Sequence, residues 1–200
     1  MKMRRALAAA TLASCVLMAA TGCSAELNIN DSAIGPVPRC DPTTHQSAGA
    51  IVLVAQSVPT ARMLPCVRAI AAGWAFERLD ARDGHATLLF NAAGGTIHPV
   101  AIAVQHRCSV GVAVQRPSDQ PGAIEYEQVT RNEESFVGKR FYVFPGGCVT
   151  YKFSVHGDTF VAMVDALLQG LGFVTREELA SKVRELSNGR LELDAKGGGS

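Results

Sequence analysis

Four cysteines lie in the part of the chain that has the composition of a folded domain, and they constrain its fold more than any other feature. They are Cys40, Cys66, Cys108 and Cys148. Disulfides form and persist in oxidising compartments outside the cytoplasm, whereas thiols in the cytoplasm are kept reduced. An even number of cysteines therefore predicts disulfides if the protein is exported. Zinc binding is the alternative, but no two of them have the Cys-x-x-Cys spacing common in zinc sites. Whether the chain is exported therefore decides what these cysteines do.

The first 22 residues have the layout of a secretory signal peptide. MKMRR gives a positively charged start, and residues 6–20 follow without a charge. This apolar run is shorter than the roughly 20 residues that a transmembrane helix needs. Small residues at 20–22 supply the expected cleavage site. We therefore expect residues 1–22 to be a leader and the rest of the chain to be exported.

Cys23 follows directly, and Ala20-Thr21-Gly22-Cys23 resembles the lipobox of bacterial lipoproteins. The resemblance covers residues 2–23. It implies that Cys23 becomes the first mature residue and carries a palmitate-bearing diacylglyceryl group on its thiol. At least two acyl chains would hold the protein firmly at the extracytoplasmic face of the cell membrane, whereas one chain binds only marginally. An ordinary cleaved signal with a chance cysteine is the alternative.

The mature chain is expected to have three parts. Residues 23–38 are polar and end near two prolines, which predicts a tether with a reach of about 20 Å. Residues 39–195 suffice for a single domain with its own core, and residues 196–200 are expected to be a flexible tail. From Cys23 onward, acidic residues outnumber Lys and Arg by two, so we expect no nucleic-acid partner.

The four cysteines allow three disulfide pairings. We favour Cys40–Cys66 and Cys108–Cys148, because these pairs close short loops within separate halves of the domain. Loops of about 25 and 40 residues would each contribute about 3–4 kcal/mol in the chain-entropy model.

Alternating apolar residues predict an antiparallel sheet. Residues 74–108 have the pattern of a three-stranded meander, with Asp83-Gly84 as a hairpin turn. Residues 123–129 alternate as a surface strand. Residues 138–155 form a longer strand pattern, which Pro145-Gly146-Gly147 interrupts as a bulge or sharp bend.

Two helices are predicted after this sheet. Residues 158–172 carry apolar side chains at helical spacing, with Asp158 or Thr159 as the expected N-cap and Gly170 or Gly172 as the expected end. Thr175 to Glu178 is the capping box of a second helix. Residues 49–56 fit a strand or a helix equally. The expected fold class is therefore α+β, with an antiparallel β-sheet packed against a C-terminal helix pair and two disulfides.

The segment RFYVFPGGCVTYKF, residues 140–153, follows AQSVPTA, LPC and GW segments further upstream. In this pattern the chain resembles a group of actinobacterial envelope lipoproteins, and the resemblance covers residues 49–155. It implies export and anchoring, and it assigns no catalytic residue.

Aromatic side chains give the strongest candidate for a contact surface. They are Phe141, Tyr142, Phe144, Tyr151 and Phe153. If one face of the sheet is uncovered, these rings would line a groove for a lipid, a glycan or a peptide. The alternative is that they pack in the core on both sides of the bend.

Catalytic and metal candidates are less well supported. Cys148 could be a nucleophile beside His106 or His156, although an oxidising compartment opposes a free thiol. His85 and His98 could meet His106 around a metal. No serine-hydrolase elbow, metalloprotease helix or nucleotide-binding loop is present, and we expect no cofactor.

These observations favour a lipid-anchored cell-envelope protein that binds or scaffolds an envelope protein, a glycan or a lipid, and that is not an enzyme. An envelope hydrolase or thiol enzyme that uses His106 and Cys148 is the alternative. An accessory subunit of a membrane complex is a third possibility.

Overall fold

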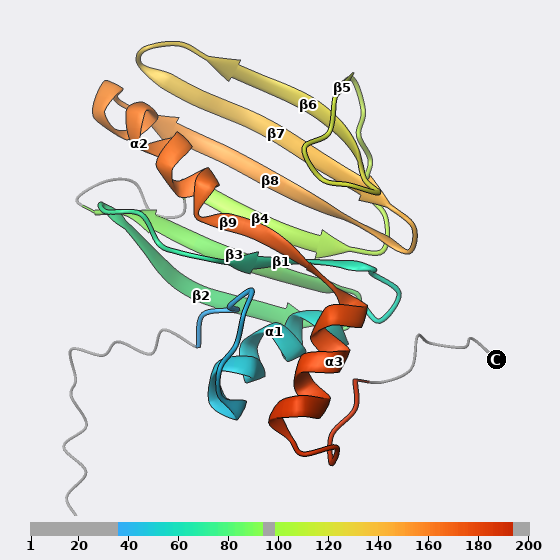
Figure 1. The fold of residues 1–200 in the computed structure, drawn as a ribbon. Helices are drawn as coiled ribbons and strands as arrows, with labels where there is room; N and C mark the ends of the chain where they lie inside the picture. The colour runs from blue at the N-terminus through green and yellow to red at the C-terminus, as the bar shows by residue number, and fades with distance from the viewer. Residues whose placement is uncertain (1–35, 94–98, 194–200) are drawn as a thin grey trace, which may run out of the picture. The chain divides into compact units, whose positions relative to one another are not determined.

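A computed structural model describes residues 36–93 and 99–193 (Figure 1). The predicted leader, Cys23, most of the tether, His98 and the predicted tail lie outside the described residues.

The larger of two sheets contains seven antiparallel strands in the order β2-β3-β4-β8-β7-β6-β5. Their bounds are β2 Trp74–Arg82, β3 His85–Ala92, β4 Val100–Gln105, β5 Val114–Arg116, β6 Ile124–Arg131, β7 Ser135–Phe144 and β8 Gly147–His156. The meander predicted over residues 74–108 is confirmed as β2, β3 and β4. Its first turn is Asp83-Gly84, where Gly84 has φ 75°.

Pro145-Gly146 forms the turn of a hairpin between β7 and β8, so the two halves of residues 138–155 are neighbours in the sheet. The strands pair along their whole length, from Ser135 opposite His156 to Phe144 opposite Gly147. Gly146 has φ 84°, and a Cβ there would come within 1.9 Å of the Thr60 carbonyl oxygen. The glycine therefore permits both the turn and its close contact with the chain after the first helix.

A second sheet pairs β1 (Met63–Val67) with β9 (Leu171–Thr175) in antiparallel register. The sequence did not predict β9, although it offered Gly170, the observed C-cap, as one of two possible ends of the preceding helix. The preceding helix ends at Gln169, because the chain must pass close to residue 69 at Gly170. A Cβ at Gly170 would meet the Ala69 carbonyl oxygen at 2.2 Å. Leu171 and Val174 are buried as members of the strand.

Three helices are described. The first, α1 (His45–Ser57), settles the ambiguous residues 49–56 as helix. The predicted C-terminal pair is confirmed as α2 (Asp158–Gln169) and α3 (Arg176–Leu186). The N-cap predicted for α2 was wrong, since Gly157 occupies that position instead of Asp158 or Thr159. No helix in residues 36–93 and 99–193 combines the length and apolar character needed to cross a membrane.

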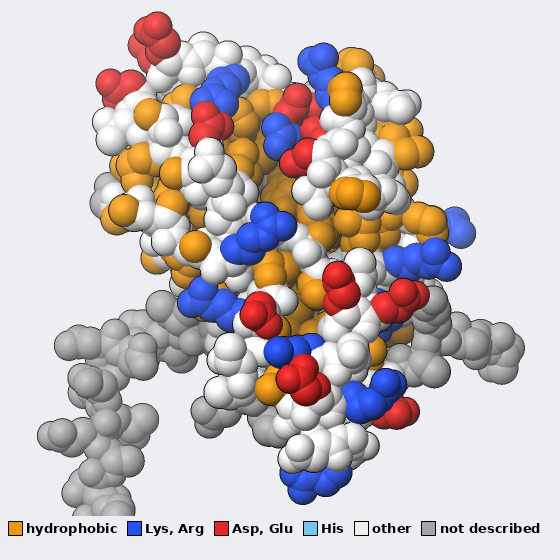
Figure 2. All heavy atoms as spheres, viewed as in Figure 1, with side chains coloured by type: hydrophobic (Ala, Val, Ile, Leu, Met, Phe, Trp, Pro, Cys, Tyr) orange, Lys and Arg blue, Asp and Glu red, His pale blue; other side chains and the backbone are white. Residues whose placement is uncertain are grey.

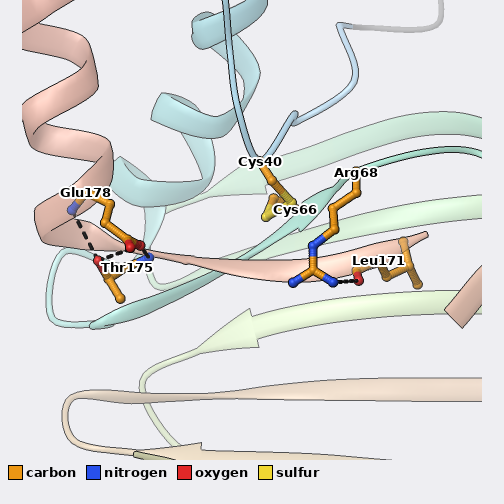
Figure 3. The surroundings of a disulfide bond; sticks show 6 residues. All are labelled: Cys40, Cys66, Arg68, Leu171, Thr175 and Glu178. Carbon is orange, nitrogen blue, oxygen red and sulfur yellow. Dashed lines mark hydrogen bonds between the residues drawn. A yellow bond between two sulfur atoms is a disulfide. The ribbon is translucent and has the colours of Figure 1, made fainter. Parts of the chain in front are cut away.

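The capping box of α3 is formed as predicted (Figure 3). The backbone N–H of Glu178 donates to Thr175 Oγ1 at 3.1 Å, and the backbone N–H of Thr175 donates to Glu178 Oε2 at 2.8 Å. These bonds satisfy donors that the first turn of a helix leaves without partners. The Thr175 hydroxyl also donates to Glu178 Oε2, at 2.9 Å. The two bonds that the carboxylate accepts from Thr175 lower the pKa of Glu178, because they favour its charged form.

The helices and the small sheet lie on the same face of the large sheet, which we call the covered face (Figure 1). Fully buried side chains from β2, β3, β4 and β8 meet side chains from α1, β1, α2 and α3 there. They include Phe76, Phe90, Leu88, Ile102, Phe153, Ile51, Val54, Leu64, Leu167 and Leu179. Each such side chain contributes about 1.5–3 kcal/mol on burial, so this face supplies most of the core. We call the opposite side of the sheet the open face.

Both predicted disulfides are present. Cys40–Cys66 joins β1 to the segment before α1, with Cα atoms 4.9 Å apart, and Figure 3 shows it beside Arg68. Cys108–Cys148 joins the chain after β4 to the start of β8, with Cα atoms 6.0 Å apart. The α+β fold class with two disulfides is therefore confirmed.

The buried side chain of Arg176 ties the start of α3 to the end of α1. Its Nε donates to the Ala61 carbonyl oxygen at 3.0 Å, and its Nη2 donates to those of Ala55 and Val58 at 2.5 and 2.9 Å. A cation at the C-terminal end of a helix is favourable, because carbonyl groups there lack intrahelical partners. This contact fixes the relative position of the two helices.

Candidate ligand-binding groove

The aromatic side chains predicted to contact a ligand are buried. None of Phe141, Tyr142, Phe144, Tyr151 and Phe153 is more than 6% exposed. Four of them belong to the main core. The Tyr142 ring packs edge-on against Tyr151 and against Phe173 of β9, at centroid distances of 5.5 and 5.2 Å. Phe141 faces the other way, opposite Thr150 on the open face. These rings stabilise the sheet and its cover, and they offer little surface to a ligand.

The cover does not extend over the whole covered face. Helix α2 packs on β7 and β8, and β5 and β6 lie beyond it (Figure 1). Figure 2 shows that this side of the molecule is hollowed between two lobes, with hydrophobic side chains in the hollow and charges of both signs beside it. Val129 of β6, Leu168 of α2 and Phe173 of β9 are partly buried apolar residues of this region. We refer to the hollow over β6 and β7 as the groove.

A cluster of charged side chains stands on this part of the covered face. Arg140 of β7 lies opposite Glu127 of β6. Its Nε and Nη2 donate to Glu127 Oε1 at 3.1 and 2.7 Å, and Nε lies 3.3 Å from Glu125 Oε1. Arg116 of β5 is 3.9 Å from the other oxygen of Glu127. Because side chains alternate along a strand, Glu125 and Glu127 point to the same side and share Arg140.

Glu125 is the most deeply buried member of the cluster, with 7% of its surface exposed. Burial raises the pKa of its carboxyl above the ordinary value, since the charged form loses water. The positive charge of Arg140 opposes this change, and the negative charges of Asp119 and Glu127 add to it. The carboxyl is thus held beside a guanidinium in surroundings that disfavour its ionisation.

Burial also acts on the neighbours of Glu125. It raises the pKa of the Tyr142 and Tyr151 hydroxyls, and Asp119 raises both further, whereas Arg140 opposes the rise. Burial alone would lower the pKa of Arg140, but hydrogen bonds to Glu127 and the surrounding negative charges raise it. Arg140 therefore stays charged, and the two hydroxyls stay protonated and can act as hydrogen-bond donors.

An ion pair links α2 to the far end of β6. Arg131 Nη1 and Nη2 donate to the two oxygens of Asp165 at 2.9 and 2.6 Å. This bidentate pairing lowers the pKa of Asp165. The guanidinium carbon of Arg131 also lies 5.2 Å from the centroid of the Phe136 ring. Both signs of charge are therefore present at each end of the groove.

The groove is suited to binding rather than to bond chemistry. Glu125 and Glu127 are both engaged by Arg140, and the two tyrosine hydroxyls lie in surroundings that oppose their ionisation. A nucleophile needs a neighbouring base that can accept its proton. Arg140 and Glu127, which are partly exposed, instead supply fixed donors and acceptors beside apolar surface, which is the composition of a ligand site.

The structure does not form the thiol–imidazole pair that the sequence suggested. Cys148 is bonded to Cys108. Thr60 Oγ1 donates to the Gly146 carbonyl oxygen at 2.5 Å and lies 2.8 Å from His106 Nδ1. Because the one hydroxyl proton goes to the carbonyl, His106 Nδ1 must be the donor to Thr60. These residues border a cavity of about 650 Å³, where they tie the β7–β8 hairpin to the chain after α1.

The remaining histidine candidates are His156, His85 and His98. His156 is at the opposite end of β8 from Cys148, roughly 26 Å away at the usual rise per residue. His85 Nε2 is 2.6 Å from Thr87 Oγ1, and His98 is not among the described residues. Within the described ranges, no three or more His, Cys, Asp or Glu side chains are grouped so that they could hold a metal ion.

The charged cluster was missed in the sequence, where residues 123–129 were interpreted as an ordinary surface strand. The available signal was a pair of acids at positions 125 and 127, two residues apart in a strand pattern. What the sequence does not contain is the register that places Arg140 opposite Glu127 and within reach of Glu125.

We compared the chain with protein-family models, with curated proteins and with solved structures, and none of the three comparisons found a match.

Proposed function

We propose that this chain is a lipid-anchored binding protein of the cell envelope, which holds its ligand in the groove over β6 and β7. The observation that carries the proposal is the buried carboxyl of Glu125 beside Arg140, on the part of the covered face that lies beyond α2 (Figure 1). Removing an ion pair from water lowers the stability of a fold, and apolar residues of the same volume in its place often make the fold more stable than the ion pair does. A partly buried charged cluster in an open groove is therefore more consistent with recognition than with stability.

The charges of the groove favour a peptide segment of another envelope protein as the ligand. Three arginines face three carboxylates in the ion pairs of this region: Arg116, Arg131 and Arg140 with Glu125, Glu127 and Asp165. A groove that carries charges of both signs suits a ligand that presents both donors and acceptors together with apolar groups, as a peptide does. An anionic lipid headgroup would favour a surplus of positive charge, and a glycan would favour exposed aromatic rings.

The groove can be tested by filling it. Val129 is on the covered face of β6, opposite Gly138, and Val137 is on the open face of the neighbouring strand. Overlapping peptides that tile the envelope proteins of the source cell would be screened for binding to the full chain. We expect some peptides to bind the unmodified protein and Val137→Trp, and to bind Val129→Trp at least tenfold more weakly. The proposal fails if no peptide distinguishes the two variants.

Anchoring needs a separate test, and it rests on the resemblance of residues 20–23 to a lipobox. The two disulfides support export, because such bonds persist mainly in oxidising compartments. Cells would be grown with labelled palmitate and fractionated with a detergent that separates into two phases. We expect Cys23→Ser to lose the label and move to the aqueous phase, whereas the matched control Cys15→Ser keeps both properties. Label retained by Cys23→Ser would contradict the assignment.

A further inference from the structure

We propose a second binding site on the open face of the large sheet, where Lys139 and Lys152 together hold a phosphate-type oxyanion. The two lysines are directly opposite each other on the neighbouring strands β7 and β8. Residues in such positions have Cβ atoms about 4.5–5.5 Å apart, and like charges placed there repel each other. A sheet that kept this pair without a ligand would lose stability from it.

The surroundings of the two lysines offer further donors. They border a hollow of about 340 Å³, and Thr130, Ser154 and Gln128 line it as well. In the strand register, Gln128 is the neighbour of Lys139, and Thr130 and Ser154 flank Val137 in the next row. Hydroxyl and amide groups can donate to an anion that lies between the ammonium groups.

No carboxylate in the described part of the chain neutralises this pair. Neither lysine is within 4.0 Å of a described Asp or Glu oxygen. The positions of β3, β4, β6, β7 and β8 that alternate onto the open face contain no described Asp or Glu. They are His85, Thr87, Leu89, Asn91, Ala101, Ala103, Gln105, Ile124, Tyr126, Gln128, Thr130, Ser135, Val137, Lys139, Phe141, Val143, Cys148, Thr150, Lys152, Ser154 and His156. Lys182 on α3, by contrast, lies 3.6 Å from both Asp41 and Glu185.

A phosphate group matches this arrangement better than a single carboxylate does. It carries three or four oxygens, so it can accept bonds from both ammonium groups and from the neighbouring hydroxyls together. Lysine binds phosphate as a compact charge with three donors. Binding between the two ammonium groups would also remove their mutual repulsion, so the two lysines should respond as one site. The site lies on the opposite face of the sheet from the groove, and it is independent of the proposed function.

The test follows both lysines individually by NMR. Reductive methylation with ¹³C-formaldehyde gives each lysine of the full chain a dimethylamino signal and keeps its charge. Inorganic phosphate would be added at constant ionic strength. We expect the signals of Lys139 and Lys152 to shift together and to saturate with one Kd, whereas Lys182 shifts little. Lys139→Gln should raise the Kd seen at Lys152 about fivefold, the upper end for one exposed ion pair.

Control variants and probes separate the possible outcomes. Lys182→Gln removes a lysine elsewhere and should leave the Kd unchanged. Shifts that do not saturate, or a Kd at Lys152 that is unaffected by Lys139→Gln, would overturn the proposal. Glycerol phosphate and vesicles of phosphatidylglycerol or phosphatidylcholine identify the source. Saturation by glycerol phosphate alone assigns a soluble phosphate ester. Saturation by phosphatidylglycerol vesicles, but not by phosphatidylcholine vesicles, assigns a lipid headgroup.

Discussion

Replacing Arg140 by methionine is the most informative perturbation of the groove. The side chain of Arg140 is 24% exposed, and it contacts Glu125 and Glu127, which are 9% and 22% exposed. Breaking a buried ion pair by removing one partner costs about 3–5 kcal/mol, because the other charge remains buried. Partial exposure of Arg140 and Glu127 reduces this cost, so we expect Arg140→Met to lower the free energy of unfolding by about 2–3 kcal/mol.

The matched variant removes the other partner. Glu125→Gln leaves Arg140 paired with Glu127 and takes a carboxyl out of an unfavourable site, so it should change stability by less than about 1 kcal/mol. In the double variant the deeply buried carboxyl is absent, and at least about 1 kcal/mol of the Arg140→Met loss should return. Urea unfolding can be followed by the fluorescence of Trp74, the single tryptophan, which is buried and donates to the Met163 carbonyl oxygen at 3.1 Å. A double variant no more stable than Arg140→Met would refute the coupling.

Three further predictions use the same unfolding assay. Arg176→Met should destabilise the protein by about 3 kcal/mol, because three carbonyl groups near the end of α1 lose a charged donor. Arg176→Lys keeps a charged donor and should cost less stability. Equal losses of stability in the two variants would contradict this reasoning. Because the pKa of Glu125 is raised, the folded state holds its carboxyl proton more tightly than the unfolded state does. The stability of the wild type should therefore fall as pH rises from about 4.3 to the folded pKa, and the stability of Glu125→Gln relative to the wild type should rise over the same range. A stability difference between the two proteins that is constant with pH would argue against a raised pKa. Replacing both Cys108 and Cys148 by alanine should cost about 4 kcal/mol, given their separation of 40 residues, and the unfolded wild type should release no thiol from this pair before reduction.

Local pattern was sufficient for most elements of the fold. The meander of β2 to β4 follows from alternation and from Asp83-Gly84, and α3 follows from its capping box. Strand β9 could not be predicted in this way, because apolar residues 171–175 follow a helix without a break in composition. Their strand conformation depends on β1, more than 100 residues earlier in the chain, which supplies the hydrogen-bonding partner. Tertiary context decides such short segments.

The candidate site depended even more on pairing between strands. The aromatic residues of β7 and β8 drew attention because they are numerous, yet large apolar side chains are most often buried. Glu125, Glu127 and Arg140 become a cluster only through the β6–β7 register, and the Lys139–Lys152 pair only through the β7–β8 register. A shift of one residue would send every side chain of a strand to the other face. Neither site is encoded in any one segment of the sequence.

The position of the groove follows from a mismatch in width between the sheet and its cover. Seven strands at about 4.8 Å spacing span about 29 Å. The cover extends over part of this width: α1 packs on β2 and β3, β1 packs on β4 and β8, and α2 packs on β7 and β8. Strands β5 and β6 lie beyond these elements (Figure 1). An apolar strand face there would be exposed to water. The ion pairs of Glu125, Glu127 and Arg140 instead place charged groups at the edge of this face, where water hydrates them, while the bottom of the groove stays partly shielded from water. The charged cluster and the open groove are thus two consequences of the same incomplete cover.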